Sequence, residues 1–206
     1  NDNSNNNNNI DVTGEIAIMK KLKNENIVRL YEVIDDPTTK RLYLIQELME
    51  GGPLMKDCLQ NKPLSSLKCR KYFRDIVRGV HYIHSQGFVH RDIKPQNILI
   101  SKNSLKKDCH YSKFDENYHN SYGDDKDDSD DDEGCFGIAK IGDLGAAVFT
   151  GGHERSTFHG TPAYTAPELN IPYELRTHNF SVMPCIDIFS MGATLFCMST
   201  GHPPWM

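Results

Sequence analysis

The sequence has no closely spaced cysteine pair, no excess of positive charge and no leader segment. Its six cysteines form no Cys-x-x-Cys pair. A chain of 206 residues is too large to need a disulfide framework, so we expect reduced, intracellular thiols. The net charge of −5 gives no electrostatic case for binding nucleic acid or an anionic membrane. We therefore expect a cytoplasmic chain that is a piece of a longer protein.

Long apolar runs are also absent, with one segment to consider. Residues 188–206 contain no Asp, Glu, Lys or Arg, but they include Gly201, His202 and two prolines. A segment with this many polar and helix-breaking residues does not suit a membrane span. It predicts a buried core helix that begins near Asp187.

The ends and the middle of the chain differ in composition. The Asn-rich residues 1–13 offer little apolar surface to bury, so we expect them to be disordered. The segment 101–137 is polar and acidic, and residues 124–133 within it carry a charge of −7. A loop of this length inside a compact domain is usually disordered. It is either a partner-binding segment or a solvated insertion, and Ser129 is a candidate for modification by an acid-directed kinase.

The remaining segments show regular hydrophobic periodicity, which predicts an α+β fold. The expected helices cover residues 15–22 and 65–86, the second with Tyr72, Ile76, Val80 and Ile83 on one face. The expected strands cover residues 27–34, 41–48, 97–100 and 138–141, and Gly51-Gly52-Pro53 is expected to break the chain.

Three short motifs follow one another in a fixed order. They are His90-Arg91-Asp92-Ile93-Lys94-Pro95-Gln96-Asn97, then Asp143-Leu144-Gly145, then the segment from Gly160 to Glu168 that ends in Ala-Pro-Glu. Together they resemble the catalytic loop, the magnesium-binding motif and the end of the activation segment of a eukaryotic protein kinase. The resemblance implies a two-lobed fold, with residues 14–48 in a partial N-lobe and residues 49–206 in a partial C-lobe.

The resemblance also implies catalytic roles. Asp92 would orient the substrate hydroxyl and accept its proton, and Lys94 would neutralise the transferring γ-phosphate of ATP. Asn97 and Asp143 would bind Mg²⁺ through oxygen atoms. Thr161 belongs to the same catalytic set. His90 is expected to be a packing residue, and Asp187 is expected to cap the backbone of the catalytic loop.

Five further positions match nucleotide-binding positions of the family. Glu15 lies where a helix glutamate pairs with a strand lysine that grips the phosphates. Gln46 matches the gatekeeper, and backbone groups of Glu47 and Met49 would face adenine. Leu99 would stack under the adenine ring, although an ordinary core leucine fits the same place.

Lys94 and the Gly160-Thr161 pair resemble serine/threonine kinases. The segments 15–37, 41–55 and 90–100, with GTPAYTAPE, look like calcium/calmodulin-dependent protein kinase kinases. That branch implies a protein substrate, such as the activation loop of another kinase. It also implies a calmodulin-binding segment beyond the kinase core.

Some expected features do not occur in the sequence. No Gly-rich phosphate loop and no Val-Ala-Ile-Lys strand precede Glu15, and the chain stops at Met206. Residues 1–206 alone are therefore expected to be unstable and inactive. A catalytically silent scaffold is the alternative to an enzyme. Arg91 is either a receiver for phosphate on Ser156 or Thr157, or an arginine held by ordinary loop contacts.

Overall fold

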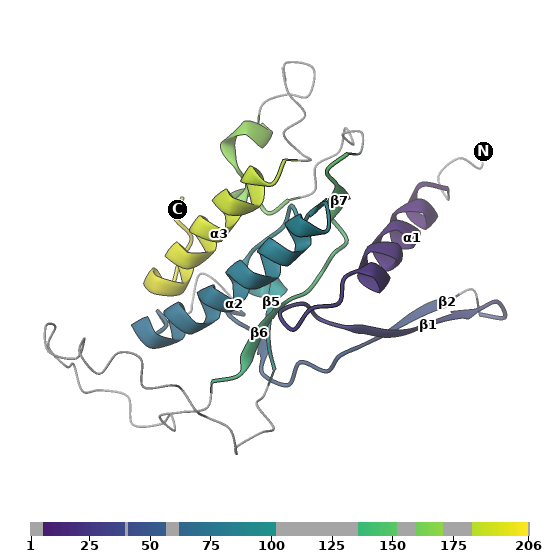
Figure 1. Ribbon diagram of the computed structural model, residues 1–206, viewed down its shortest axis with the longest axis horizontal. Helices are drawn as coiled ribbons and strands as arrows, with labels where there is room; N and C mark the ends of the chain where they lie inside the picture. The colour runs from purple at the N-terminus through teal and green to yellow at the C-terminus, as the bar shows by residue number, and fades with distance from the viewer. Residues whose placement is uncertain are drawn as a thin grey trace, which may run out of the picture.

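The computed structural model describes residues 6–39, 41–56, 62–101, 136–151, 160–170 and 183–205. These residues form a mixed α+β fold, as the sequence predicts (Figure 1). Its helices are α1 (Asn6–Lys21), α2 (Ser66–Ser85) and α3 (Cys185–Thr200), with short 3₁₀ turns at Pro95–Asn97, Pro162–Tyr164 and Pro167–Asn170. Its strands are β1 (Leu30–Asp36), β2 (Arg41–Gln46), β3 (Gly52–Pro53), β4 (Phe88–Val89), β5 (Ile98–Ser101), β6 (Ile138–Ile141) and β7 (Val148–Phe149).

Helix α2 confirms the prediction for residues 65–86. Its N-cap is Ser65, whose side chain accepts a hydrogen bond from the Lys68 backbone N–H at 3.4 Å. The predicted apolar face is buried, and its members Tyr72, Ile76, Val80 and Ile83 are all less than 9% exposed. Helices α2 and α3 lie side by side in Figure 1, so this face is covered by α3 and by the strands beneath it.

Helix α1 begins earlier than the sequence suggests. The expected helix started near Gly14, after a disordered Asn-rich tract, whereas α1 starts at Asn6, inside that tract. Adding residues to a helix costs far less than starting one, because each added residue gains a hydrogen bond. The apolar turn of Ile18, Met19 and Leu22, which is buried, supplies the tertiary contacts on which the extension depends.

The strands form three small antiparallel sheets. Strands β1 and β2 pair as a hairpin, in which Asp36 at the end of β1 lies opposite Arg41 at the start of β2. Strand β5 lies between β3 and β6, and β4 pairs with β7. The expected break at Gly51-Gly52-Pro53 is in part a strand, because Gly52 pairs with Ile100 and Pro53 with Leu99. This pairing is at a sheet edge, where proline is tolerated.

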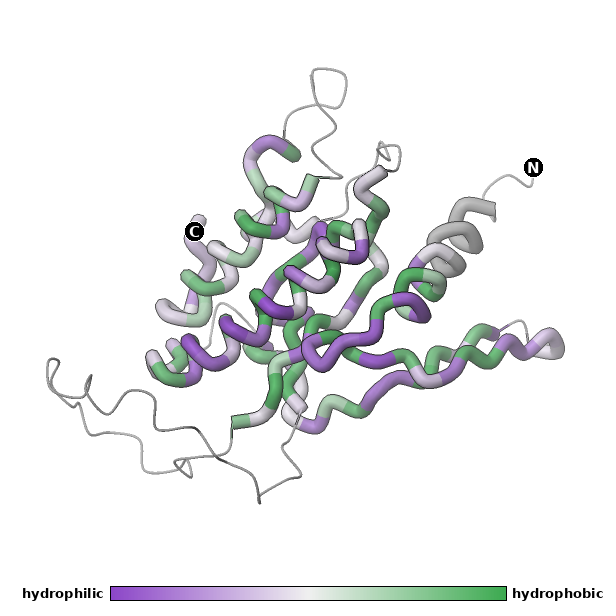
Figure 2. The backbone as a smooth tube through the Cα atoms, viewed as in Figure 1, coloured by the Kyte–Doolittle hydropathy of each residue, from purple (hydrophilic) through white to green (hydrophobic). Residues whose placement is uncertain are grey.

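The main core lies between α2, α3 and the sheet of β5 and β6, where apolar segments of all four elements meet (Figure 2). Helix α3 is apolar almost throughout. The sequence predicts a buried core helix, but α3 is not buried on all of its sides. Ile186, Met191 and Met198 are buried, whereas Ile188 is 56% and Phe196 40% exposed. One side of α3 packs on α2 and the described chain leaves the other side open. No helix within the described residues is long and apolar enough to cross a membrane.

Candidate active site

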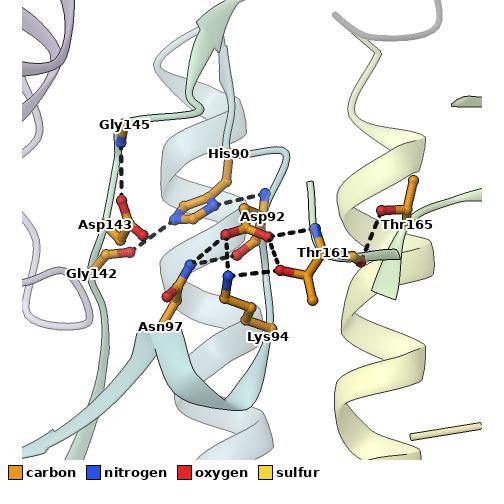
Figure 3. Close-up of polar contacts among 9 residues, drawn as sticks. All are labelled: His90, Asp92, Lys94, Asn97, Gly142, Asp143, Gly145, Thr161 and Thr165. Atoms are coloured by element: carbon orange, nitrogen blue, oxygen red, sulfur yellow. Dashed lines mark hydrogen bonds and ion pairs between the residues drawn. The ribbon is translucent and has the colours of Figure 1, made fainter. Parts of the chain in front are cut away.

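The predicted catalytic residues of the loop before β5 converge on the carboxylate of Asp92 (Figure 3). Asp92 Oδ2 accepts hydrogen bonds from Lys94 Nζ at 2.6 Å and from Asn97 Nδ2 at 3.0 Å. Asp92 Oδ1 accepts from the backbone N–H of Thr161 at 3.2 Å and from its hydroxyl at 3.0 Å. Lys94 Nζ also donates to Thr161 Oγ1 at 2.7 Å. Four donors thus fix the orientation of one carboxylate.

Asp187 of α3 holds the backbone of the same loop through hydrogen bonds. Asp187 is fully buried, and its two oxygens accept hydrogen bonds from the backbone N–H groups of His90 and Arg91, each at 2.8 Å. His84 of α2 lies 2.8 Å from Asp187 Oδ2 through its Nε2. Arg91 has a φ of +69°, which a non-glycine residue adopts only when its surroundings enforce it. The predicted capping role of Asp187 is confirmed.

His90 joins the catalytic loop to the segment that carries Asp143. Its ring Nδ1 accepts from the Asp92 N–H at 3.2 Å, and its Nε2 lies 3.1 Å from the carbonyl oxygen of Gly142. The Gly142 N–H in turn donates to the Asn97 carbonyl at 2.9 Å. His90 is fully buried, so the prediction that it packs and forms hydrogen bonds is confirmed. Asp143 follows directly and has a left-handed φ of +57°.

Glu15 of α1 lies close to Asp143. A side chain placed on Gly145 would meet Asp143 Oδ1 at 3.4 Å and Glu15 Oε2 at 3.6 Å, so both carboxylates border the same small volume. Burial raises the pKa of Glu15 above its ordinary value, and the nearby charge of Asp143 raises this pKa further. Two facing carboxylates form a place where a cation is favourable.

Asn97 and Asp143 offer oxygen atoms of the kind that magnesium prefers. The Asn97 amide nitrogen donates to the carbonyl and carboxylate of Asp92, so the Asn97 amide oxygen is the atom that could bind a metal ion. With the carboxylate of Asp143 this gives two hard oxygen donors. The described residues contain no cluster of three or more His, Cys, Asp or Glu side chains that could hold a metal. Phosphate and water oxygens would therefore complete the coordination of Mg²⁺.

The expected adenine-facing segment lies after β2. The Glu47 N–H donates to the Arg29 carbonyl at 2.8 Å, so the Glu47 carbonyl is the backbone group that remains for a base. The Met49 carbonyl accepts from the Gly52 N–H at 3.0 Å and closes a turn. Gln46 reaches Met19 of α1, with 3.8 Å between Nε2 and Sδ. Among the described residues, no hydrogen bond joins these three residues to Asp92 or Asp143.

Leu99 of β5 is close to the metal-binding motif. A side chain on Gly142 would meet Leu99 Cδ1 and Val28 Cγ2, each at 3.4 Å. Leu99 is partly exposed and pairs with Lys140 of β6 and Pro53 of β3. An apolar surface next to Gly142 is thus available for a flat ring.

Some residues that support the site lie outside the three sequence motifs. Lys140 of β6 forms an ion pair with Glu47, with 2.6 Å between Nζ and Oε1, and His84 contacts Asp187 as described above. Strand alternation was the available signal for Lys140, because it faces away from its buried neighbours Ala139 and Ile141. The candidate phosphorylation residues Ser129, Ser156 and Thr157 lie outside the described residues.

Comparisons with known proteins agree with this geometry. The family described as "Protein kinase domain" matches residues 1–206. The chain is 36% identical over 194 residues to serine/threonine-protein kinase ssp1 of Schizosaccharomyces pombe and 35% identical over 206 residues to serine/threonine-protein kinase TOS3 of Saccharomyces cerevisiae. It is 34% identical over 195 residues to a probable serine/threonine-protein kinase, MARK-A, of Dictyostelium discoideum.

Each of these alignments covers 94% of this chain, but a smaller share of the relative. The chain spans 26% of ssp1, 31% of TOS3 and 14% of MARK-A. None of these names mentions calmodulin, so the expected calmodulin partner gains no support from them.

Proposed function

The chain belongs to the protein kinase family, and on that premise we propose that it transfers the γ-phosphate of ATP to a serine or threonine hydroxyl of a protein substrate. The observation that carries the proposal is the convergence of Lys94, Asn97 and Thr161 on Asp92, beside Asp143. Phosphoryl transfer depends chiefly on positioned groups and on compensation of charge, and this cluster supplies both.

In this proposal Asp92 is the catalytic acceptor of the substrate proton. An ionised carboxylate only accepts hydrogen bonds, which fits the four donors around it. These donors fix the carboxylate, so little reorganisation is needed when a hydroxyl arrives. Losing a positioned acid–base group typically lowers the rate by about 10²–10⁴-fold.

Lys94 supplies the positive charge nearest to Asp92. Its ammonium lies between Asp92 Oδ2 and Thr161 Oγ1, at 2.6 and 2.7 Å. A γ-phosphate beside Asp92 would therefore meet Lys94 directly. Thr161 fixes both partners, because its hydroxyl donates to Asp92 and accepts from Lys94.

Asn97 and Asp143 would hold magnesium, which when bound neutralises phosphate charge. The left-handed φ of Asp143 supports such a role, since strained backbone is retained where its geometry is used. Glu15 would face a lysine ammonium, whose positive charge would offset the repulsion from Asp143 that raises the pKa of Glu15. The base of ATP would lie between the 46–49 segment, including Gln46, and Leu99.

Two finer assignments complete the proposal. The substrate is another kinase's activation loop, which is supported by the resemblance of the sequence to calcium/calmodulin-dependent protein kinase kinases. The lobes divide after residue 48, between the β1–β2 hairpin with α1 and the elements that follow. A silent scaffold is the weaker alternative, because Asp92, Lys94, Asn97 and Asp143 are all present.

The test is phosphate transfer by the full-length protein. Purified protein is incubated with γ-labelled ATP, Mg²⁺ and an inactive kinase as substrate, and the labelled amino acid is identified after hydrolysis. We expect label on serine or threonine, its loss on chelation of Mg²⁺, and its loss in Asp143→Asn but not in the exposed control Asp35→Asn. Nucleotide binding without any transfer would instead establish the scaffold.

A further inference from the structure

An ion pair connects the expected base-binding segment to the strand that leads to Asp143. Lys140 Nζ lies 2.6 Å from Glu47 Oε1, although the two residues are 93 positions apart in the sequence. The Lys140 side chain is 13% exposed and that of Glu47 is 21% exposed. The second oxygen of Glu47 accepts from the Arg29 N–H at 3.3 Å. Both oxygens of Glu47 are thus used to fix its position.

Lys140 lies on β6, a strand that is bonded on both of its sides. Its neighbour Ile141 pairs with Ile98 of β5 on one side and forms a parallel bridge with Ile27 on the other. The Val28 N–H donates to the Ile141 carbonyl at 2.9 Å. Gly142, the next residue, is bonded to the catalytic loop through both its N–H and its carbonyl. Lys140 is therefore joined to Asp143, three residues later, by backbone that is bonded to β5 and to the catalytic loop.

The pair also links elements that belong to different sheets. The β1–β2 hairpin, which leads into Glu47, is a sheet of its own, and β6 belongs to the sheet of β3 and β5. The Glu47–Arg29 backbone bond ties the segment after β2 to the segment before β1. The Lys140–Glu47 pair ties it to β6 across the gap between the sheets.

We propose that Lys140 is a positioning residue which, through Glu47, holds the base-binding segment in register with the strand that carries Asp143. A nucleotide could then bind through its base and its magnesium-bound phosphates at the same time, because the base-binding segment and the Asp143 strand are already aligned. This inference rests on the proposed function, because it assigns the base and the metal to opposite ends of the Lys140–Glu47 link.

A groove with further charged residues lies beside the pair. The pair borders a groove of about 380 Å³ whose other charged lining residues are Lys23, Glu25 and Arg29. The groove gives water and ions access to the pair. The contribution of the pair to alignment should therefore fall as the salt concentration rises.

The test compares variants of the full-length protein. Lys140→Met removes the charge, Lys140→Arg keeps it, and Lys20→Met is a matched loss of one exposed lysine from α1. We expect Lys140→Met to raise the KM for ATP and the Kd for MgADP by about three- to tenfold, a size usual for coupling between contacting residues. The kcat and the Kd for adenosine alone should change less than about twofold, since adenosine does not reach the metal side.

Further measurements isolate the pair itself. Lys140→Arg should restore the KM, and Glu47→Gln should have the same effect as Lys140→Met, with no added loss in the double variant. A Lys140→Met protein that matches Lys20→Met would overturn the inference. So would equal weakening of adenosine and MgADP, which would mean local damage to the base site. A wild-type protein that binds no MgADP and transfers no phosphate would overturn the proposed function, and this inference with it.

Discussion

The catalytic loop and the β1–β2 hairpin differ in how completely their side chains are held. In the loop, Asp92 has four hydrogen-bond donors, and His90 and Asp187 are fully buried. In the hairpin, large apolar side chains are open to solvent, with Tyr31 60% and Tyr43 45% exposed. The hairpin joins the rest mainly through backbone contacts near its base and the Glu47–Lys140 pair.

This difference corresponds to the two proposed tasks of these regions. The catalytic loop would perform phosphate transfer, and the segment after the hairpin would hold the base of the nucleotide. The groups assigned to phosphate transfer are oriented by contacts within the described chain, so they are ordered before any ligand arrives. The proposed base-binding segment depends on a few long-range links. Substitutions should therefore be costly around the loop and inexpensive in the hairpin.

The largest effect should come from Asp187→Ala. It leaves the backbone N–H groups of His90 and Arg91 buried without their acceptor, and removal of one member of a buried charged contact costs about 3–5 kcal/mol. Urea unfolding of the full-length variants measures the loss, with Asp35→Asn in the hairpin as the control. A cost below about 1 kcal/mol for Asp187→Ala would mean that the loop is held by other contacts.

A core substitution should come next. Ile76→Ala removes a side chain that is 1% exposed, so the free energy of unfolding should fall by about 2–5 kcal/mol. Ile34→Ala in the hairpin, at 42% exposure, should cost less than about 1 kcal/mol. The same urea measurement compares them. Equal costs would show that another part of the protein covers the hairpin.

A smaller, pH-dependent effect is expected at Glu15. Because its folded-state pKa is raised, the folded state binds more protons than the unfolded state just above the ordinary value of 4.5. Stability is therefore lost as the pH rises through this range. Above this range of pH, Glu15→Gln should raise the free energy of unfolding, and with it the melting temperature, by less than about 1 kcal/mol for this half-exposed group. Below the range it should change neither.

The matched control for that measurement is Glu32→Gln, which removes an exposed carboxylate from the hairpin. It should not change the pH profile. A melting temperature that falls in Glu15→Gln at neutral pH would reveal a cation that pairs with Glu15 in solution.

The smallest effect should be at the hairpin turn. Hydrogen bonds from the Thr38 and Thr39 side chains and backbone lower the pKa of Asp36 to about 2. The stabilisation this gives is present above the ordinary value of 3.8 and is lost as the pH falls toward 2. An NMR titration of the Asp36 carboxyl should return toward 3.8 when both threonines are replaced by valine. An unchanged titration in that variant would contradict the assigned hydrogen bonds.

Local patterns in the sequence were enough to predict the elements that carry the proposed catalytic residues. The spacing of Ile76, Val80 and Ile83 predicts α2, and the short apolar runs predict β5 and β6. The motifs predict the grouping of Asp92 with Asn97, because only a few residues separate them. Such features depend on residues that are close together in the sequence, so a single sequence is enough to predict them.

Other features depend on contacts between distant segments. The Glu47–Lys140 pair joins residues 93 positions apart, and no local pattern reports it. The open side of α3 was not predicted, because an apolar composition does not reveal which faces find a partner. The start of α1 at Asn6 was missed because composition describes the Asn-rich tract but not the helix that extends into it.

The most direct test of the account compares turnover with nucleotide binding in Asp92→Asn of the full-length protein. Asparagine keeps the shape of the side chain but cannot accept a proton as a carboxylate does. We predict that phosphate transfer falls by about 10²–10⁴-fold while the Kd for MgADP stays within about threefold of the wild-type value. Undiminished transfer by Asp92→Asn would mean that this carboxylate is not the catalytic acceptor.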